Sequence, residues 1–558
     1  MTELTKNRAT NVINMADYNL SAKKEIIPKI HAVIPRKSGK IDFDIFDQEM
    51  IFNDEKTKEL IRTGNTIGCF YIESPGMRSL LKKLKCDTFE MLTAASSIIR
   101  PGVAESGMMQ EFIARHKNPN RRKYLIPEME KHLRETYGIM IYQEDVLKIA
   151  HHVVGFSLEE ADLLRRAMSG KMRSHSEMKK LSDKFFVLCK KKNYSHNVSM
   201  ALWKQIESFA GYAFNKAHSA SFAILSFQVA YLKVHFPAQF MANVLNNRGG
   251  YYSAAVYIQE SKRMGLRILL PNINKSKYEY VGKNGEIRIG FMAIKSLMRN
   301  SIEQVIEERN KNGQFSSLSD FIYRTNLSYK EATLLITIGA MSCFEKTRPT
   351  LMRLLDIYIV SQKIMVGDLF QHEAYKLEGE VATDVEYTIE KICALELETF
   401  GYMISRHPLQ FFSYLTNNQN VISAKEIPKH RGKIVRMVGW FMTSKRIKTK
   451  KGKIMKFLSL EDLTGTFEAI LFPKVYAQFA EKTLSMGPYF VKGRIDDEDG
   501  DNIIVSNLAI ISDKLISAIA QKDSAETQYT GDKEKVYEEE FMIIDSLGKE
   551  KLRRAYAS

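Results

Sequence analysis

Phe209-Ala-Gly-Tyr-Ala-Phe-Asn-Lys-Ala-His-Ser219 lies inside a long apolar part of the chain. The surrounding span, residues 202–244, carries apolar and aromatic side chains at mixed three- and four-residue spacings, which predicts helices buried on most sides. Lys216 and His218 interrupt this run, and such groups are costly in apolar surroundings unless they face a cleft. One interpretation places them at the triphosphate of a nucleotide, with Lys216 as a point charge and His218 as a donor. The alternative is a satisfied core histidine.

A second basic group precedes this stretch, in Leu163-Leu-Arg-Arg-Ala-Met-Ser-Gly-Lys171. Adjacent arginines on one helix cannot both lie on its apolar face, so at least one of Arg165 and Arg166 points outward. A guanidinium in that position can grip a phosphate with two hydrogen bonds. The alternative is an ordinary solvated face, because basic pairs are common on helices.

The overall composition favours a polyanionic partner. The chain has 558 residues, with 82 Lys and Arg against 65 Asp and Glu, and a formal net charge of +17. Its five cysteines are scattered without a CxxC pair, which argues against structural zinc and a disulfide framework. No segment approaches the ~20 apolar residues of a membrane helix, and the start lacks the apolar core of a signal peptide. We therefore expect a cytoplasmic protein with no membrane partner.

The periodicity changes from helical to strand-like near residue 433. Five short runs rich in β-branched and aromatic residues follow, in segments 434–439, 457–460, 467–472, 489–493 and 503–506. A helix-like piece, residues 475–485, lies between the third and fourth runs. This order is the outline of an OB barrel. The charged tail, residues 516–558, is expected to be partly disordered.

The predicted barrel contains the densest basic segment. Residues 431–456 include ten basic residues and no acidic one. Cations this dense repel one another unless a polyanion neutralises them, and aromatic side chains among them suit base stacking. A solvated hairpin loop is the alternative. The predicted DNA-binding residues are Lys445, Arg446, Lys448, Lys450, Lys451, Lys453, Trp440 and Phe457.

Six stretches resemble, in order and at similar spacing, the C family of DNA polymerases, represented by the alpha subunit of bacterial DNA polymerase III. They are Gly68-Cys-Phe-Tyr-Ile-Glu-Ser, Ile99-Arg-Pro-Gly, Glu135-Thr-Tyr-Gly-Ile-Met-Ile-Tyr-Gln-Glu144, Glu160-Ala-Asp-Leu-Leu-Arg-Arg-Ala-Met, the stretch 209–219, and Leu232-Lys-Val-His-Phe-Pro-Ala-Gln-Phe-Met241. The resemblance covers roughly residues 50–515. The sequence departs from the family at Val103, where a second proline is usual, and at Ser169, where glycine is commoner.

The resemblance implies a multidomain, mainly α protein that ends in a β OB-fold barrel. Its expected order is a junction to a palm (1–55), fingers (56–250), a tandem helix-hairpin-helix region with a short β entry (251–365), a clamp-binding loop and connector (366–430), the OB fold (431–515) and the tail (516–558). The family's fingers close on an incoming dNTP. Arg165, Arg166, Lys216 and His218 match its basic positions, and Tyr142 and Gln143 are placed near the same cleft.

The family's catalytic carboxylates lie in a palm with a motif like Pro-Asp-x-Asp-x-Asp-Phe, which this sequence lacks before Gly64. Such carboxylates hold two divalent cations for phosphoryl transfer. The acidic group Asp42, Asp44 and Asp47 aligns better with the linker into the fingers. We therefore expect no catalytic residue and no metal site in this chain. The complete enzyme would need Mg²⁺, and the chain alone should not polymerise.

Two further modules follow from the resemblance. The first hairpin, Ala293-Ile-Lys-Ser-Leu-Met298, lacks the expected glycine pair, whereas the second keeps Gly339 and is equally compatible with plain helix packing. A functional hairpin offers backbone amides to a DNA phosphate, which usually requires glycine. Asp368, Leu369 and Phe370 lie where the family carries a peptide that docks on the sliding clamp through aliphatic and aromatic anchors.

Two hypotheses therefore remain. The chain is the fingers-to-OB part of a DNA-directed DNA polymerase, binding primer–template, single-stranded DNA, dNTP and a sliding clamp, in replication or lesion-tolerant synthesis, with a palm polypeptide encoded separately. Alternatively, it is a non-catalytic accessory protein derived from a polymerase, which binds single-stranded DNA or associates with the clamp. The two hypotheses differ in whether DNA binding depends on the correct dNTP.

Overall fold

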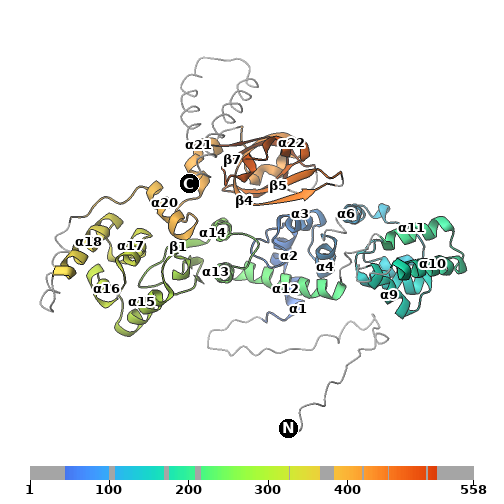
Figure 1. Ribbon diagram of the computed structural model, residues 1–558, viewed down its shortest axis with the longest axis horizontal. Helices are drawn as coiled ribbons and strands as arrows, with labels where there is room; N and C mark the ends of the chain where they lie inside the picture. Colours follow the sequence, from blue (N-terminus) through green and yellow to red (C-terminus); the bar gives the residue numbers. More distant parts are fainter. Residues whose placement is uncertain are drawn as a thin grey trace, which may run out of the picture. The chain divides into compact units, whose positions relative to one another are not determined.

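The computed structural model describes residues 44–99, 107–168, 175–207, 215–325, 327–364, 382–417, 420–449, 451–497 and 501–511. Helices make up most of the chain before residue 430, and a closed barrel of strands follows (Figure 1). This arrangement confirms the predicted fold class of helical regions followed by an OB-like barrel.

The first helical region extends to residue 263. Its elements are α1 (Gln48–Asn53), α2 (Glu55–Arg62), α3 (Pro75–Leu84), α4 (Phe89–Ile98), α6 (Met108–Lys117), η2 (Pro119–Arg121), α7 (Met129–Leu133), α8 (Gln143–Lys148), η3 (Ile149–Val154), α9 (Leu158–Met168), α10 (His175–Lys191), α11 (His196–Glu207), α12 (Lys216–His235), α13 (Pro237–Asn247) and α14 (Ala254–Arg263).

Helix α12 is the longest helix in the part of the chain that the structure describes, with 20 residues. It begins at Lys216 because the side chain of Asn215 accepts a hydrogen bond from the amide of His218, which caps the helix. It packs against α4, whose small buried side chains allow a close approach. The hydroxyls of Ser97 and Ser219 lie 2.7 Å apart across this contact. The apolar span predicted to be buried on most sides therefore forms a central helix of this region.

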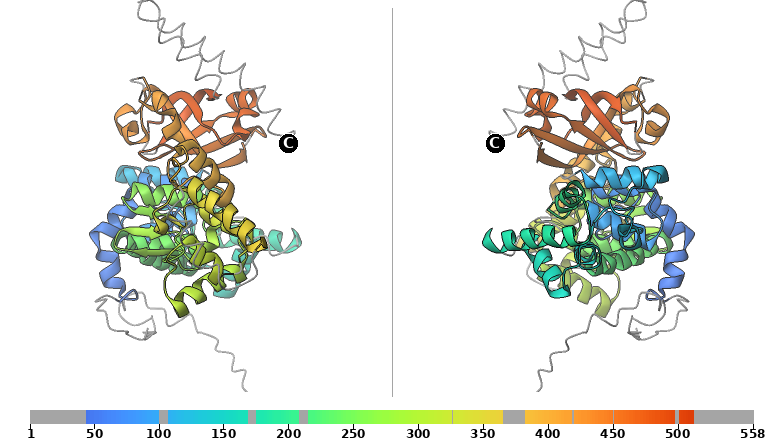
Figure 2. Two further views of the ribbon diagram at one scale, coloured as in Figure 1. Left: turned by 90° about the vertical axis from the view of Figure 1, so that its left-hand side faces the viewer. Right: turned by 90° about the vertical axis from the view of Figure 1, so that its right-hand side faces the viewer.

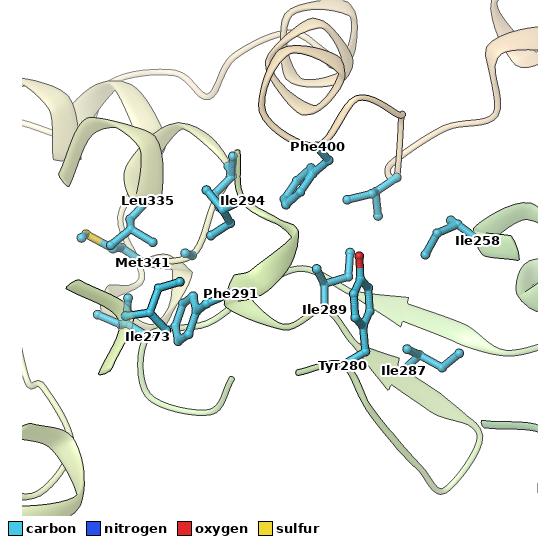
Figure 3. Packing of buried hydrophobic residues seen from close by; sticks show 14 of the residues in the cluster. Ile258, Ile273, Tyr280, Ile287, Ile289, Phe291, Ile294, Leu335, Met341 and Phe400 are labelled. Carbon is cyan, nitrogen blue, oxygen red and sulfur yellow. The ribbon is translucent and has the colours of Figure 1, made fainter. Parts of the chain in front are cut away.

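The second region begins with a small sheet of β1 (Arg267–Leu269), β2 (Val281–Lys283) and β3 (Glu286–Arg288) in the order β1-β3-β2. It continues with η4 (Phe291–Ala293), α15 (Arg299–Asn312), α16 (Leu318–Arg324), α17 (Tyr329–Thr337), η5 (Ser342–Phe344), α18 (Arg348–Ile364) and α20 (Ile389–Phe400). Buried side chains from the sheet, the hairpins and α20 form one apolar cluster, in which Ile289, Tyr280 and Phe400 lie close together (Figure 3).

A connector leads from α20 into the barrel, with η7 (Pro408–Phe412), α21 (Ser413–Thr416) and η8 (Ala424–His430). The barrel strands are β4 (Ile434–Lys448), β5 (Ile454–Glu461), β6 (Thr466–Leu471), β7 (Tyr489–Ile495) and β8 (Asn502–Ile510), with α22 (Pro473–Phe479) and η9 (Lys482–Leu484) between β6 and β7. The strands close in the order β4-β5-β6-β8-β7. Figure 2 shows the barrel region, in orange and red, from two sides.

Alternation along each barrel strand produces its core. Leu458 and Leu460 of β5, Val491 of β7 and Leu508 of β8 are fully buried in one apolar cluster. Strand β4 is longer than its partners, and its last five residues, 444–448, are all exposed. The end of β4 and the turn into β5, residues 444–449 and 451–454, therefore form a mostly exposed edge of the barrel, called the ribbon below, which carries most of the predicted DNA-binding cations.

A buried charge network joins α12, α14 and the barrel. The Nζ of Lys233 donates to the carbonyls of Asn65 and Ile67 and to Oε1 of Glu260, at 2.7, 2.8 and 2.8 Å. Arg263 bonds Glu260 at 3.3 Å and Glu461 of β5 at 2.8 Å. Because Lys233 is only 1% exposed, its charge is compensated entirely by these protein groups.

Candidate nucleotide and nucleic-acid sites

Arg165 and Gln143, which the sequence placed near one cleft, are in direct contact. Nη1 of Arg165 donates to Oε1 of Gln143 at 2.8 Å, so the end of α9 meets the start of α8. The same guanidinium also bonds Asp162 at 2.8 Å, and its side chain is 20% exposed. Arg165 is thus held in a fixed orientation by two neighbours.

Arg166 shares the same carboxylate. Its Nε lies 2.6 Å from Oδ2 of Asp162, but its side chain is 58% exposed. The i+3 and i+4 spacing from Asp162 places both arginines within reach of one acidic side chain. The sequence prediction missed Asp162 as the counter-ion, although this spacing could have identified it. A phosphate that binds here must compete with one carboxylate for two guanidinium groups.

Lys216 at the start of α12 is also paired. Its Nζ lies 2.7 Å from Oε2 of Glu135 and 5.3 Å from the ring centroid of Tyr142. Its backbone amide donates to both carboxylate oxygens of Glu144, at 3.0 and 3.2 Å. Glu144 therefore occupies the position at the helix N-terminus where the free amides and the helix dipole favour an anion.

Tyr142 lies beneath this group and is 1% exposed. Its hydroxyl is buried and makes no hydrogen bond with the described residues. Burial, together with the nearby carboxylates of Glu135 and Asp145, raises the pKa of Tyr142 well above its ordinary value. The structure thus places Tyr142 as an apolar support under Lys216, and it stays neutral at any physiological pH.

His218 lies two residues further along α12, and its side chain is exposed. Its ring lies edge-on to Phe222 at 4.4 Å, and Phe222 stacks on Tyr71 at 4.7 Å and on Phe70 at 5.5 Å. Phe70 is 46% exposed. His218 therefore borders an aromatic surface formed with the loop before α3, and the sequence prediction did not include these three aromatic residues.

The barrel ribbon has a different charge arrangement from the fingers. Lys445, Arg446, Lys448, Lys451 and Lys453 are all exposed. Among the described residues, none of the five forms an ion pair with a carboxylate, although Lys445 lies within electrostatic range of Glu468. These cations are therefore available to a polyanion without the loss of an existing ion pair.

The two predicted stacking residues occupy different environments. Phe457 lies directly opposite Lys445 in the β4–β5 register, so their side chains share one face of the sheet. Trp440 is half-buried and packs against the cluster that contains Leu409 and Val438. Lys456, which contributed to the basic run, is buried and donates to the carbonyl and hydroxyl of Thr483 at 2.7 and 3.0 Å.

Known proteins are similar to this chain in sequence. The profile of the bacterial DNA polymerase III alpha subunit finger domain matches residues 23–193. A helix-hairpin-helix motif matches residues 265–351. DNA polymerase III subunit alpha from Staphylococcus aureus (strain COL) is 31% identical over 482 residues, which are 86% of this chain and 44% of that protein.

This chain is similar to the DNA polymerase III alpha subunit in its finger and helix-hairpin-helix segments. The protein of that name from Bacillus subtilis (strain 168) is 32% identical over 499 residues, covering 88% of this chain and 44% of its own length. The chain therefore spans less than half the length of the curated relatives it matches. The paired arginines of α9 lie within the matched finger segment, whereas Lys216 of α12 and the exposed cations of the barrel lie outside both matched segments.

The hairpin motif differs between its two copies in this chain. In the first hairpin, Ser296 has φ +66°, a left-handed conformation that usually requires glycine. The amides of Ser296 and Leu297 have no acceptor within the described residues, because the neighbouring amides of Lys295 and Met298 donate to Thr399 and Glu331. The missing glycine pair therefore does not prevent this turn from presenting two amides.

The second hairpin uses its amides internally. Gly339 has φ +77°, and its amide and that of Ala340 donate to Ile336 and Leu335 at the end of α17. A Cβ at Gly339 would lie 2.6 Å from Nη2 of Arg348. Gly339 thus ends a helix and allows α18 to approach closely, which corresponds to the helix-packing alternative.

Several predicted features lie outside the described residues. They are Asp368, Leu369 and Phe370 of the clamp-binding loop, Lys450, the stretch 209–214, the departures Val103 and Ser169, and most of the junction and tail. Asp44 is described, and its carboxylate accepts a hydrogen bond from the amide of Phe46 at 2.9 Å. Within the described ranges, no group of three or more metal-ligand side chains is present, and no helix is long and apolar enough to cross a membrane.

Proposed function

We propose that this chain acts as the finger-to-barrel part of a DNA-directed DNA polymerase and binds DNA and an incoming dNTP. The observation that carries the proposal is the exposed ribbon of five cations without ion-pair partners among the described residues, in a chain that is similar to the polymerase III alpha subunit. The relatives are named as DNA polymerase subunits. Their whole activity, in replication or lesion-tolerant synthesis, extends to this chain only as part of the proposal.

DNA binding on the ribbon follows from electrostatics. Each cation that lies on a phosphate releases condensed counterions, so affinity falls steeply with salt. Phe457 beside Lys445 supplies an aromatic surface for a base next to a cation for its phosphate. The free amides of Ser296 and Leu297 offer a second contact to the backbone of a duplex.

Capture of dNTP at α8, α9 and α12 would proceed by ion exchange. A triphosphate would displace Asp162 from Arg165 and Arg166, and would displace Glu144 from the start of α12. Lys216 would exchange Glu135 for a phosphate oxygen, and exposed His218 would donate a further hydrogen bond. Mg²⁺ would accompany the dNTP, and palm carboxylates outside the described residues would supply the two-metal chemistry.

A charge-reversal variant tests the dNTP site. In Arg165→Glu/Arg166→Glu, binding of a fluorescent dNTP in the presence of Mg²⁺ and primer–template should be lost, whereas affinity for single-stranded DNA should change less than about threefold. Lys190→Glu/Lys191→Glu on the exposed end of α10 is the matched control, with the same change in net charge. Equal loss of dNTP and DNA binding in the test variant would refute the assignment of separate roles.

One observation favours a second candidate function. Arg165, Arg166 and Lys216 are all paired with carboxylates, whereas the ribbon cations are not. A non-catalytic accessory protein that binds single-stranded DNA or a sliding clamp would retain such an arrangement. Its DNA affinity would be unaffected by the correct dNTP, and no palm polypeptide would restore primer extension. The polymerase proposal predicts tighter binding to primer–template when the correct dNTP is present.

A further inference from the structure

Three histidines gather on the finger region away from the proposed dNTP site. The rings of His132 on α7 and His152 on η3 are stacked, with centroids 4.7 Å apart and planes at 2°. His151 lies edge-on to His152 at 4.6 Å. His152 is exposed, and the other two rings are partly exposed. Solvent and solutes can therefore reach this group.

The backbone of η3 produces this arrangement. It is a π-helix, a form that is rare and often found at functional sites. Gly155, with φ +98°, ends it, and Nδ1 of His151 lies 2.7 Å from the carbonyl oxygen of Phe156. His151 is thus anchored to the backbone, whereas the described residues offer no hydrogen-bond partner to His132 or His152.

The charged groups that act on the stacked pair are all basic. Burial is the largest cause that lowers the pKa of His132 and of His152, and Lys131 and Lys148 lower both further. His152 adds to this effect on His132, as His151 does on His152.

No carboxylate contributes to the pKa shifts of the stacked pair, and three carboxylates on the neighbouring helices are engaged elsewhere. On α8, Asp145 is buried and accepts the amides of Ile141 and Tyr142, although it lies within electrostatic range of Lys148. On α9, Glu160 pairs with Lys184 of α10, and Asp162 pairs with both arginines. The histidine–lysine patch, defined as Lys131, His132, Lys148, His151 and His152, thus has no carboxylate partner among the described residues.

We propose that the histidine–lysine patch binds the phosphodiester backbone of a nucleic acid and takes up protons as it does so. A phosphate near Lys131 and Lys148 would offset the repulsion that keeps His132 and His152 neutral. Each imidazole would then accept one proton from solvent and become a second donor toward the phosphates. The ligand is a polyanion rather than a metal ion, because no group of three metal-ligand side chains forms within the described residues and the nearby lysines repel cations.

The sign of the pH dependence follows from linkage. The imidazole pKa values are lowered in the free protein and raised in the complex, so the complex binds more protons than its components. Affinity therefore rises as the pH falls. Each linked proton can contribute up to about tenfold per pH unit, and between pH 7.5 and 5.8 we expect about a tenfold gain through the patch.

The test compares His132→Gln/His152→Gln with the wild-type chain. Fluorescence anisotropy with a labelled 20-base-pair duplex and a labelled oligo-dT would be measured at pH 7.5 and 5.8 at constant ionic strength. The variant should lose the pH-dependent gain with at least one of the two probes and should differ less than about twofold at pH 7.5. His196→Gln, an exposed histidine on α11, should keep the full gain.

Two further measurements complete the test. Lys131→Met/Lys148→Met should weaken binding at both pH values, which a purely structural role of the histidines would not predict. Circular dichroism and urea unfolding at pH 7.5 check that each variant is folded. An unchanged pH dependence of DNA binding in the histidine variant would overturn the proposal. Competition for the patch by inorganic triphosphate as effective as that by DNA, at equal phosphate charge, would also overturn it. Because the dNTP and ribbon residues are unaltered, this failure is distinguishable from failure of the proposed function.

Discussion

Replacing Lys233 by Met should destabilise the helical region without changing its surface. Met matches the length of the lysine stem but removes the ammonium group. The carbonyls of Asn65 and Ile67 then lose their donor, at 2.7 and 2.8 Å, and Glu260 loses its closest cation at 2.8 Å. Arg263 remains beside Glu260 at 3.3 Å and offsets part of the loss.

Removal of one partner from a buried ion pair costs about 3–5 kcal/mol of unfolding free energy. Because Arg263 stays in place, we expect about 3 kcal/mol, at the lower end of that range. Burial alone would raise the pKa of Glu260, but Lys233 and Arg263 outweigh it and lower the pKa to about 2. This carboxylate therefore stabilises the fold above its ordinary pKa of 4.5 and loses that contribution as the pH falls toward 2. In Lys233→Met, the pKa of Glu260 should be higher, so the loss of stability on acidification should begin at a higher pH than in the wild type.

Urea unfolding followed by the helical circular dichroism signal measures both effects. The control is Lys204→Met, an exposed lysine on α11, which should change the unfolding free energy by less than about 0.5 kcal/mol. A Lys233→Met chain within about 1 kcal/mol of the wild type at pH 7 would show that the network does not stabilise the fold as reasoned.

Three other substitutions test separate parts of the account. In Gly290→Ala, the new Cβ would lie 2.3 Å from the carbonyl carbon of Glu279, so the unfolding free energy should fall by about 1–3 kcal/mol and thermal unfolding should occur at a lower temperature. Gly249→Ala, whose Cβ has its nearest atom at 3.6 Å, should be nearly neutral. Burial raises the pKa of Asp145 to about 7, so the folded state favours the protonated form of this carboxyl group. The stability that Asp145 contributes therefore falls as the pH rises from about 4 past 7. Urea unfolding of Asp145→Asn should therefore show a gain relative to the wild type of about 1–3 kcal/mol between pH 5 and 8, and no relative gain would contradict the raised pKa. In Glu144→Gln, a weaker competitor for the start of α12, fluorescent dNTP should bind severalfold tighter, and weaker binding would contradict the exchange mechanism.

Much of the fold follows from local sequence patterns. The change from helical to alternating periodicity near residue 433 predicts the barrel and the helix between its third and fourth strands, and both are present. The apolar span around Phe227 predicts helices buried on most sides, but α12 buries one face, which includes Ala223 and Phe227, and leaves His218 and Leu225 exposed. Such patterns depend on neighbours in sequence, which is why they can be recognised without tertiary structure.

Pairing between distant residues could not be predicted in the same way. Glu144 and Lys216 are 72 positions apart, and only the packing of α8 against the start of α12 brings them together. Trp440 appeared available for stacking because the sequence does not reveal that the connector covers it. Asp162 could have been predicted as the partner of both arginines, because it precedes them by three and four residues on the same helix.

The salt dependence of single-stranded DNA binding tests the central claim most directly. Each phosphate contact contributes about 0.7 to the slope of log affinity against log salt, so five ribbon cations should contribute about 3.5. Oligo-dT binding would be measured for the wild type and for a variant with Gln at Lys445, Arg446, Lys448, Lys451 and Lys453.

The matched control carries Gln at five exposed lysines on or just after α10, namely Lys179, Lys180, Lys190, Lys191 and Lys192. It removes the same net charge from a surface outside the ribbon. We predict that the ribbon variant loses about 3.5 from the slope and that the control loses less than about 1. Equal slopes for the ribbon variant and the wild type would contradict the proposal that the barrel ribbon binds DNA.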